Sequence, residues 1–180
     1  MKKYDLIYTD PAWSYGKSTG RGVAANHYST MSLDDIKALP VNSLLKSDGL
    51  VYMWATFPLL KEALAVGEAW GLEYVSVGFT WVKLNSDGSC FIGLGHHTRS
   101  NSEVCLIFRK GKGLSRSGKC FSSVIMSRVG KHSEKPKRAY VILEGLYNVS
   151  DRLEMFARHK RRGWDVWGNQ APSETQEVLF

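Results

Sequence analysis

Apolar residues along the chain fall into short runs separated by polar and turn-forming segments. Runs of this length, rich in Val, Ile, Tyr, Phe and Trp, are typical of buried strands. The dipeptide Asp48-Gly49 predicts a turn into the second run. The pattern predicts strands at residues 4–9, 50–56, 73–83, 103–108, 152–157 and 164–168.

Three segments between these runs carry helix signals instead. Ser32, followed by Asp35 three residues later, is typical of a helix N-cap. Pro58 and Pro136 each stand where a first helical turn begins, and Gly71 follows the last residue of the second pattern. The predicted helices cover residues 32–39, 59–71 and 137–147.

Strands that alternate with helices predict an α/β fold in one layered domain over residues 1–180. Long polar or basic stretches predict mobile loops at about 14–31 and 110–134, and a polar tail at 171–180. In α/β sheets, ligands bind beyond the carboxyl ends of the strands. Asp10 directly follows the first predicted strand, so we expect it at that edge. No GxGxxG motif follows a strand, which argues against a dinucleotide site.

Composition narrows the class of protein. The 180 residues are 43% hydrophobic and 23% charged, as in ordinary globular proteins. No apolar run approaches the roughly 20 residues of a membrane-spanning helix, and the start has no signal-peptide core. The three cysteines stand apart and His96-His97 has no further ligands nearby, so no metal site is predicted. We expect a cytoplasmic protein without a membrane partner.

Positive charge is concentrated late in the chain, within a net charge of +7. It gathers in the segments 109–119, 128–138 and 158–162. Clustered cations attract the phosphates of nucleic acid, although any single cluster is also typical of a solvated surface. We expect phosphate contacts from Lys112, Arg116 and Lys119.

The segment Asp10-Pro11-Ala12-Trp13 carries the candidate chemistry. Asp-Pro after a strand is often only a turn, but a Trp on an exposed loop at this edge indicates recognition by stacking. The Asp10 carboxylate and the Pro11 carbonyl can accept both N–H bonds of an exocyclic amine. They would stabilise the charge that develops when this poor nucleophile attacks. Trp13 would stack on the base and orient it.

With these residues, the chain resembles the adenine-N6 methyltransferases of the DPPW signature. This is the MT-A70-like family of the mRNA adenine methylase catalytic subunit, which has compact bacterial and bacteriophage members. The resemblance covers nearly the whole chain. Its further blocks are Tyr28–Met31, Val51–Trp54, Trp81–Lys83, Arg99 with Asn101 and Glu103, His132–Pro136, Phe156–Arg158 and Gly163–Gln170.

The resemblance implies a Rossmann-like fold that uses S-adenosylmethionine (SAM), with the motifs in permuted (beta-class) order. It assigns the target amine to Asp10 and Pro11, and base stacking to Trp13. It places the methionine amine of SAM at Asp10 and the methionine carboxylate at Lys135. It assigns ribose binding to Arg158, His159, Asn169 and Gln170, and the seating of adenine to Tyr28 and Glu103.

Ala12 departs from the signature, because the family usually has a second proline there. The residue-11 carbonyl is retained, but some rigidity is lost, at a cost of about 0.4–1 kcal/mol.

The resulting prediction is methyl transfer from SAM to N6 of adenine in DNA. Adenine in RNA is an alternative substrate, since the pocket sees the base rather than the sugar. A non-catalytic nucleic-acid-binding subunit of the same fold is a third reading, which the presence of Asp10 and Trp13 disfavours. The recognised site, and whether the protein is a monomer or a homodimer, do not follow from the sequence.

Overall fold

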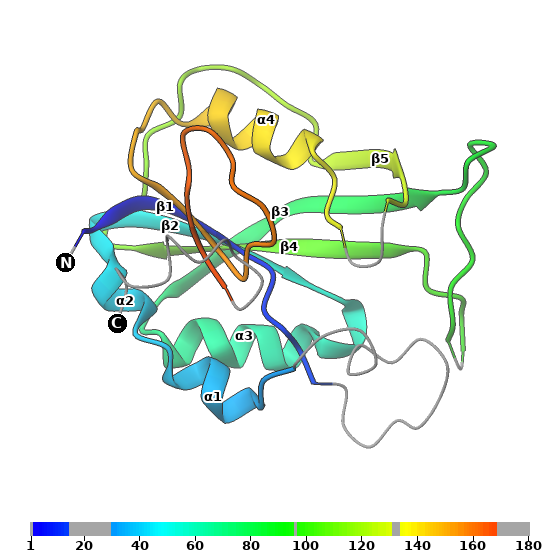
Figure 1. Cartoon of the computed structure of the whole chain (residues 1–180), viewed down its shortest axis with the longest axis horizontal. Helices are drawn as coiled ribbons and strands as arrows, with labels where there is room; N and C mark the ends of the chain where they lie inside the picture. The colour runs from blue at the N-terminus through cyan, green and yellow to red at the C-terminus, as the bar shows by residue number, and fades with distance from the viewer. Residues whose placement is uncertain (1, 15–29, 96, 131–133, 169–180) are drawn as a thin grey trace.

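The protein is built around a mixed sheet of seven strands among the residues that the structure describes (Figure 1). This computed structural model describes residues 2–14, 30–95, 97–130 and 134–168. The strand order is β5-β3-β4-β2-β1-β6-β7. The strands are β1 (Tyr4–Thr9), β2 (Leu45–Ala55), β3 (Glu73–Leu84), β4 (Ser102–Lys110), β5 (Val124–Arg128), β6 (Arg152–Met155) and β7 (Asp165–Trp167).

Strand direction decides which loops meet at each edge of the sheet. β1 pairs in parallel with β2 and β6, β6 with β7, and β3 with β5. β4 runs antiparallel to both of its neighbours, β2 and β3. The carboxyl ends of all the other described strands therefore meet the amino end of β4 at one edge, which we call the carboxyl edge.

Helices cover both faces of the sheet (Figure 1). One face carries α1 (Leu33–Ala38), α2 (Val41–Leu44) and α3 (Leu60–Ala69), which follows the 3-10 turn η2 (Phe57–Leu59). The other face carries α4 (Arg138–Leu146). No described helix is both long and apolar enough to cross a membrane.

Two hydrophobic cores follow from this layering. Alternate residues of β2 divide between them: Val51 and Met53 pack with α1–α3, whereas Tyr52 and Trp54 pack with α4. Successive strand residues point to opposite faces. A strand buried on both faces therefore reads as a continuous apolar run.

Several local predictions are confirmed. The strand predicted at residues 4–9 is β1. Ser32 caps α1, with its Oγ accepting a hydrogen bond from the Asp35 N–H at 3.1 Å. Gly71 ends α3 with a φ of 68°, the left-handed conformation that glycine adopts without strain.

Two predictions about the chain path are wrong. Asp48-Gly49 is no turn before a strand, because β2 already begins at Leu45 and a register shift against β1 absorbs these residues. The stretch predicted as an irregular excursion at 110–134 contains β5, which adds to the sheet beside β3. The tail predicted at 171–180, and nearly all of the loop predicted at 14–31, lie outside the described residues.

Candidate active site

The carboxyl edge brings together residues from five elements. Asp10 directly follows β1, and the residues after β6 reach the same edge because the two strands are parallel neighbours. Glu103 lies there because β4 is reversed, and Lys83 because β3 ends there. Lys135 lies just before α4, the helix that covers the other face of the sheet from α1–α3.

Four of these side chains form a chain of alternating charges. Lys135 Nζ lies 2.6 Å from Asp10 Oδ2 and 3.3 Å from Glu103 Oε2. Lys83 Nζ donates to Glu103 Oε1 at 2.5 Å. The side chains of Lys135 and Glu103 are only 11% and 12% exposed, so each needs the other's charge. Asp10 is 28% exposed, and both Asp10 and Lys135 line a cleft.

The pKa values along this chain differ because the neighbours differ. Burial lowers the pKa of Lys135, but the two carboxylates beside it raise that pKa above its ordinary value. Burial likewise raises the pKa of Glu103, yet its two lysine neighbours bring it below the ordinary range. For Asp10 burial prevails, since it contacts one lysine and is repelled by Glu103, and its pKa is raised.

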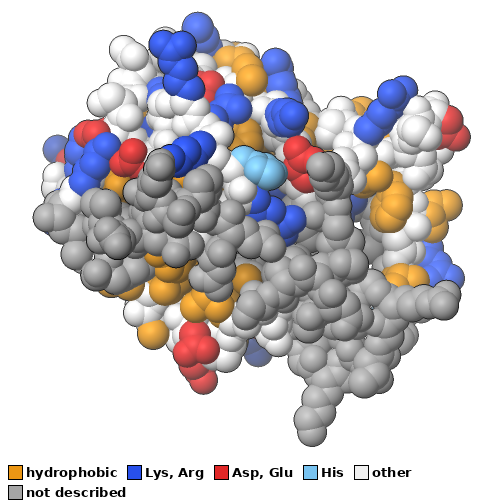
Figure 2. All heavy atoms as spheres, viewed as in Figure 1, with side chains coloured by type: hydrophobic (Ala, Val, Ile, Leu, Met, Phe, Trp, Pro, Cys, Tyr) orange, Lys and Arg blue, Asp and Glu red, His pale blue; other side chains and the backbone are white. Residues whose placement is uncertain are grey.

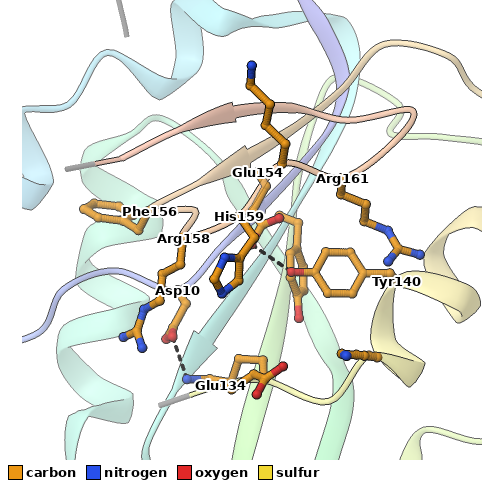
Figure 3. Close-up of a pocket in the computed structure, with 12 residues that line it drawn as sticks. Asp10, Glu134, Tyr140, Glu154, Phe156, Arg158, His159 and Arg161 are labelled. Atoms are coloured by element: carbon orange, nitrogen blue, oxygen red, sulfur yellow. Dashed lines mark hydrogen bonds and ion pairs between the residues drawn. The ribbon is translucent and has the colours of Figure 1, made fainter. Parts of the chain in front are cut away.

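A cleft opens beside Asp10, between the end of β6 and the start of α4 (Figure 3). Arg158 lies beside Asp10 and His159 extends toward the middle of the cleft (Figure 3). Lys135 also lines the cleft. The structure thus brings together four of the predicted cofactor residues. The others, Asn169 and Gln170, lie outside the described residues, as does Tyr28.

Glu154, in the middle of β6, is a cleft residue that the sequence analysis missed. Its Oε1 accepts a hydrogen bond from the Tyr140 hydroxyl at 2.7 Å. Burial raises the pKa of Glu154 to about 7, which the bond from Tyr140 only partly offsets. The sequence does carry a signal for it. Glu154 is an acidic residue between Leu153 and Met155, the two apolar residues of a short strand.

Glu154 makes a testable contribution to stability against pH. Its pKa is raised above the ordinary value of 4.5 to about 7, so the folded state binds the proton more tightly than the unfolded chain. The contribution of Glu154 to the free energy of unfolding is therefore fully present below about pH 4.5. It is lost as pH rises through 7, by on the order of 1–3 kcal/mol. We expect Glu154→Gln to raise the melting temperature at pH 8 and to leave it nearly unchanged at pH 5.

Thermal melts of wild type, Glu154→Gln and the exposed α3 control Glu68→Gln, taken between pH 5 and 8, measure this effect. Parallel curves for wild type and Glu154→Gln would contradict the assignment.

Trp13 corrects one expectation. The sequence predicts an exposed indole, but Trp13 is only 6% exposed and packs in the core with α1–α3. Its Nε1 donates to the Trp54 carbonyl at 3.1 Å. An indole buried with its N–H satisfied is stable there, so Trp13 secures the motif to β2. Base stacking by Trp13 stays a prediction that requires the ring to become uncovered.

The Pro11 carbonyl already has one partner. It accepts the Trp13 backbone N–H at 2.8 Å. A carbonyl oxygen has two lone pairs, so Pro11 keeps capacity for a second donor. Because the Trp13 side chain is buried, its backbone N–H is held in place and fixes the direction of the Pro11 carbonyl. This is the carbonyl that the sequence analysis assigns to the target amine of adenine.

The predicted phosphate contacts lie elsewhere. β4 leaves the sheet at the edge opposite Asp10, where the Lys112 N–H donates to Asp48 Oδ1 at 2.6 Å. The chain then follows the last turn of α4, with Ser117 Oγ donating to the Gly145 carbonyl. The structure does not bring Lys112 and Arg116 beside Asp10. Phosphate binding by these residues and Lys119 stays a prediction about a different surface.

The sheet, with its motif after β1 and its cleft at the carboxyl edge, defines a Rossmann-like fold of the SAM-dependent methyltransferase type. The model of the MT-A70 family matches residues 4–170. The chain therefore belongs to the MT-A70 family.

Curated relatives that match nearly the whole of this chain are methyltransferases, and several of them are much longer than it. The chain is 33% identical over 199 residues to the Type II methyltransferase M.MunI of Mycoplasma sp, covering 98% of this chain and 82% of that protein. It is 31% identical to the N6-methyladenosine RNA methyltransferase MTA1 of Cryphonectria parasitica, over 93% of this chain and 51% of that protein. It is 29% identical to the N(6)-adenine-specific methyltransferase METTL4 of Mus musculus, over 94% of this chain and 38% of that protein.

Proposed function

We propose that this protein transfers a methyl group from SAM to the N6 amine of adenine in DNA, in the cytoplasm. The observation that carries the proposal is the pairing of Asp10 with Lys135 at the mouth of one cleft, directly after the first strand. DNA is favoured because the relative that matches 98% of this chain, over 82% of its own length, is a type II methyltransferase.

The cleft suits SAM in charge and shape. The methionine part of SAM carries one ammonium and one carboxylate, which match Asp10 and Lys135. Arg158 and His159 supply donors for the ribose, and the Phe156 and Tyr8 rings supply apolar walls. When bound, SAM supplies a sulfonium-activated methyl group. Glu103 would keep Lys135 charged while it holds the carboxylate.

Asp10 has the chemistry to activate the amine. Each carboxylate oxygen has two lone pairs, so Asp10 keeps acceptor capacity beyond its bond to Lys135. Its raised pKa makes it a better proton acceptor than an exposed aspartate. The Asp10 carboxylate and the Pro11 carbonyl would accept the two N–H bonds and stabilise the positive charge that forms on nitrogen during attack. In a duplex, the adenine would first leave the base stack.

RNA is the second candidate substrate, because the fungal MTA1 relative is an RNA methyltransferase. The test offers labelled SAM with matched single-stranded and duplex DNA and RNA oligonucleotides, followed by digestion to nucleosides. We expect N6-methyladenine from DNA at a higher rate than from RNA. The absence of labelled N6-methyladenine from every substrate would contradict the proposal, and a faster RNA reaction would replace DNA with RNA.

A further inference from the structure

Lys83 is one end of the chain of four charges at the carboxyl edge. It stands near the end of β3, and Glu103 stands near the start of β4. Trp81 lies directly opposite Glu103 in the register of the two strands, so Lys83, two residues further along β3, lies on the same face of the sheet. The Lys83 N–H donates to the Asn101 carbonyl, and its carbonyl accepts from the Phe91 N–H, each at 2.9 Å. The sheet therefore holds the backbone of this lysine in place.

Two buried indoles support the lysines of this chain. Lys83 Nζ lies 5.0 Å from the centroid of the Trp81 ring, and Lys135 Nζ lies 5.9 Å from that of the Trp54 ring. The two rings pack edge to face, with their centroids 6.4 Å apart. Attraction between an ammonium and a ring face adds to the ion pairs and keeps both lysines beside Glu103.

Glu103 gives one carboxylate oxygen to each lysine. Its Oε1 accepts from Lys83 at 2.5 Å, whereas its Oε2 lies 3.3 Å from Lys135 Nζ. Lys135 lies closer to Asp10, at 2.6 Å. Lys83 is therefore the nearer cation for Glu103, and Asp10 is the nearer anion for Lys135.

Only one half of this chain borders the cleft. Among the residues that the structure describes, Asp10 and Lys135 line the cleft and Lys83 and Glu103 do not. A ligand in the cleft is thus in contact with Lys135 but not with Lys83. Any influence of Lys83 on that ligand has to pass through Glu103.

The charges beside the cleft balance only when Lys83 is counted. Asp10, Glu103 and Lys135 together carry a net charge of −1, and Lys83 brings the sum to zero. An ammonium has three donors, so Lys135 can keep both partners and still donate to a third acceptor. A further carboxylate at Lys135 would be repelled by a net negative group, but not by a neutral one.

Nearby charges decide this balance more than distant ones. Figure 2 shows Lys and Arg side chains on several sides of the histidine near the middle of the molecule, with acidic side chains between them. Opposite charges that alternate over a surface largely cancel at a distance, and salt screens what remains. The potential at Lys135 is consequently set by its immediate partners.

We infer that Lys83 is a positioning residue for SAM: it neutralises Glu103, and thereby lets Lys135 bind the methionine carboxylate. The inference rests on the proposed function, in which Lys135 takes that carboxylate. It assigns part of the affinity for SAM to a side chain that does not touch the ligand. A lysine that only stabilised the sheet would instead affect every ligand of the cleft alike.

The test uses calorimetry with SAM and with decarboxylated SAM, which keeps the sulfonium and the ammonium but lacks the carboxylate. We expect Lys83→Met to weaken SAM binding about tenfold, because Glu103 then repels the ligand carboxylate without a counter-charge. Binding of decarboxylated SAM should be unchanged or slightly tighter, since the repelled group is missing. Lys83→Arg keeps the positive charge and should bind SAM within about threefold of wild type.

A second variant removes the charge that Lys83 balances. In Lys83→Met/Glu103→Gln the remaining pair, Lys135 with Asp10, is neutral, so SAM affinity should return to within about threefold of wild type. This double variant also leaves no enclosed carboxylate without a nearby cation, which protects its folding.

Lys46→Met is the matched control. Lys46 also bridges two carboxylates, those of Asp5 and Asp151, but at the amino end of β2, away from the cleft. Its loss should leave SAM affinity unchanged, whatever it costs in melting temperature.

Unchanged SAM binding by Lys83→Met, or equal losses for SAM and decarboxylated SAM, would overturn the positioning role. A double variant that binds SAM as weakly as Lys83→Met would overturn it as well. If wild type binds SAM but methylates no adenine, the proposed reaction fails while the binding comparison still decides the role of Lys83. If wild type does not bind SAM, both proposals fail.

Discussion

Asp10→Asn is expected to lower kcat for adenine methylation by about 10²–10³-fold, the usual effect of removing one preorganised transition-state contact. The amide keeps the shape of the carboxylate but loses the negative charge that accepts the amine protons and stabilises the developing cation. Single-turnover assays with saturating SAM and DNA measure this loss.

The same substitution should leave the fold intact. The pKa of Asp10 is raised, so its ionised form costs free energy in the folded protein at neutral pH. The melting temperature of Asp10→Asn should therefore equal or exceed that of wild type. Asp34→Asn, an exposed carboxylate on α1, is the control with unchanged activity. Full activity in Asp10→Asn would remove this residue from the mechanism.

Lys135→Met is expected to weaken SAM binding by about 100-fold, the effect of losing a charge-assisted contact of about 3 kcal/mol. Calorimetric titration with SAM, or with its demethylated product, measures the change. Lys61→Met, at an exposed position near the start of α3, should bind as wild type does. Unchanged binding by Lys135→Met would refute its assignment to the methionine carboxylate.

Lys135→Met should also destabilise the protein, by about 3–5 kcal/mol, because it leaves two enclosed carboxylates without their shared cation. Their repulsion raises both pKa values, so the loss should be larger at pH 8 than at pH 5. Adding Asp10→Asn removes one of the two charges and should recover part of the melting temperature. Failure of the double variant to recover any stability would show that the loss has another cause.

The local signals in the sequence were sufficient where short-range chemistry decides the outcome. The Ser32 cap, the Gly71 helix end and the apolar run of β1 each depend on neighbours within a few residues. Local signals failed at Asp48-Gly49, since pairing with β1 overrode the turn preference of this dipeptide. They also failed at β5, because a short edge strand gains its hydrogen bonds from β3 and carries little pattern of its own.

The candidate active site shows the same difference between features set by neighbouring residues and features set by long-range contacts. Asp10 was placed at the carboxyl edge because it follows a strand, a relation within one segment of chain. The burial of Trp13, the bond of Lys135 to Asp10 and the raised pKa of Glu154 depend on contacts between residues distant in the sequence. Hydrophobic patterning thus determines most of the elements, and the set of motifs indicates the class of protein. Only packing sets the local dielectric and the charge partners, and with them which side chains can act.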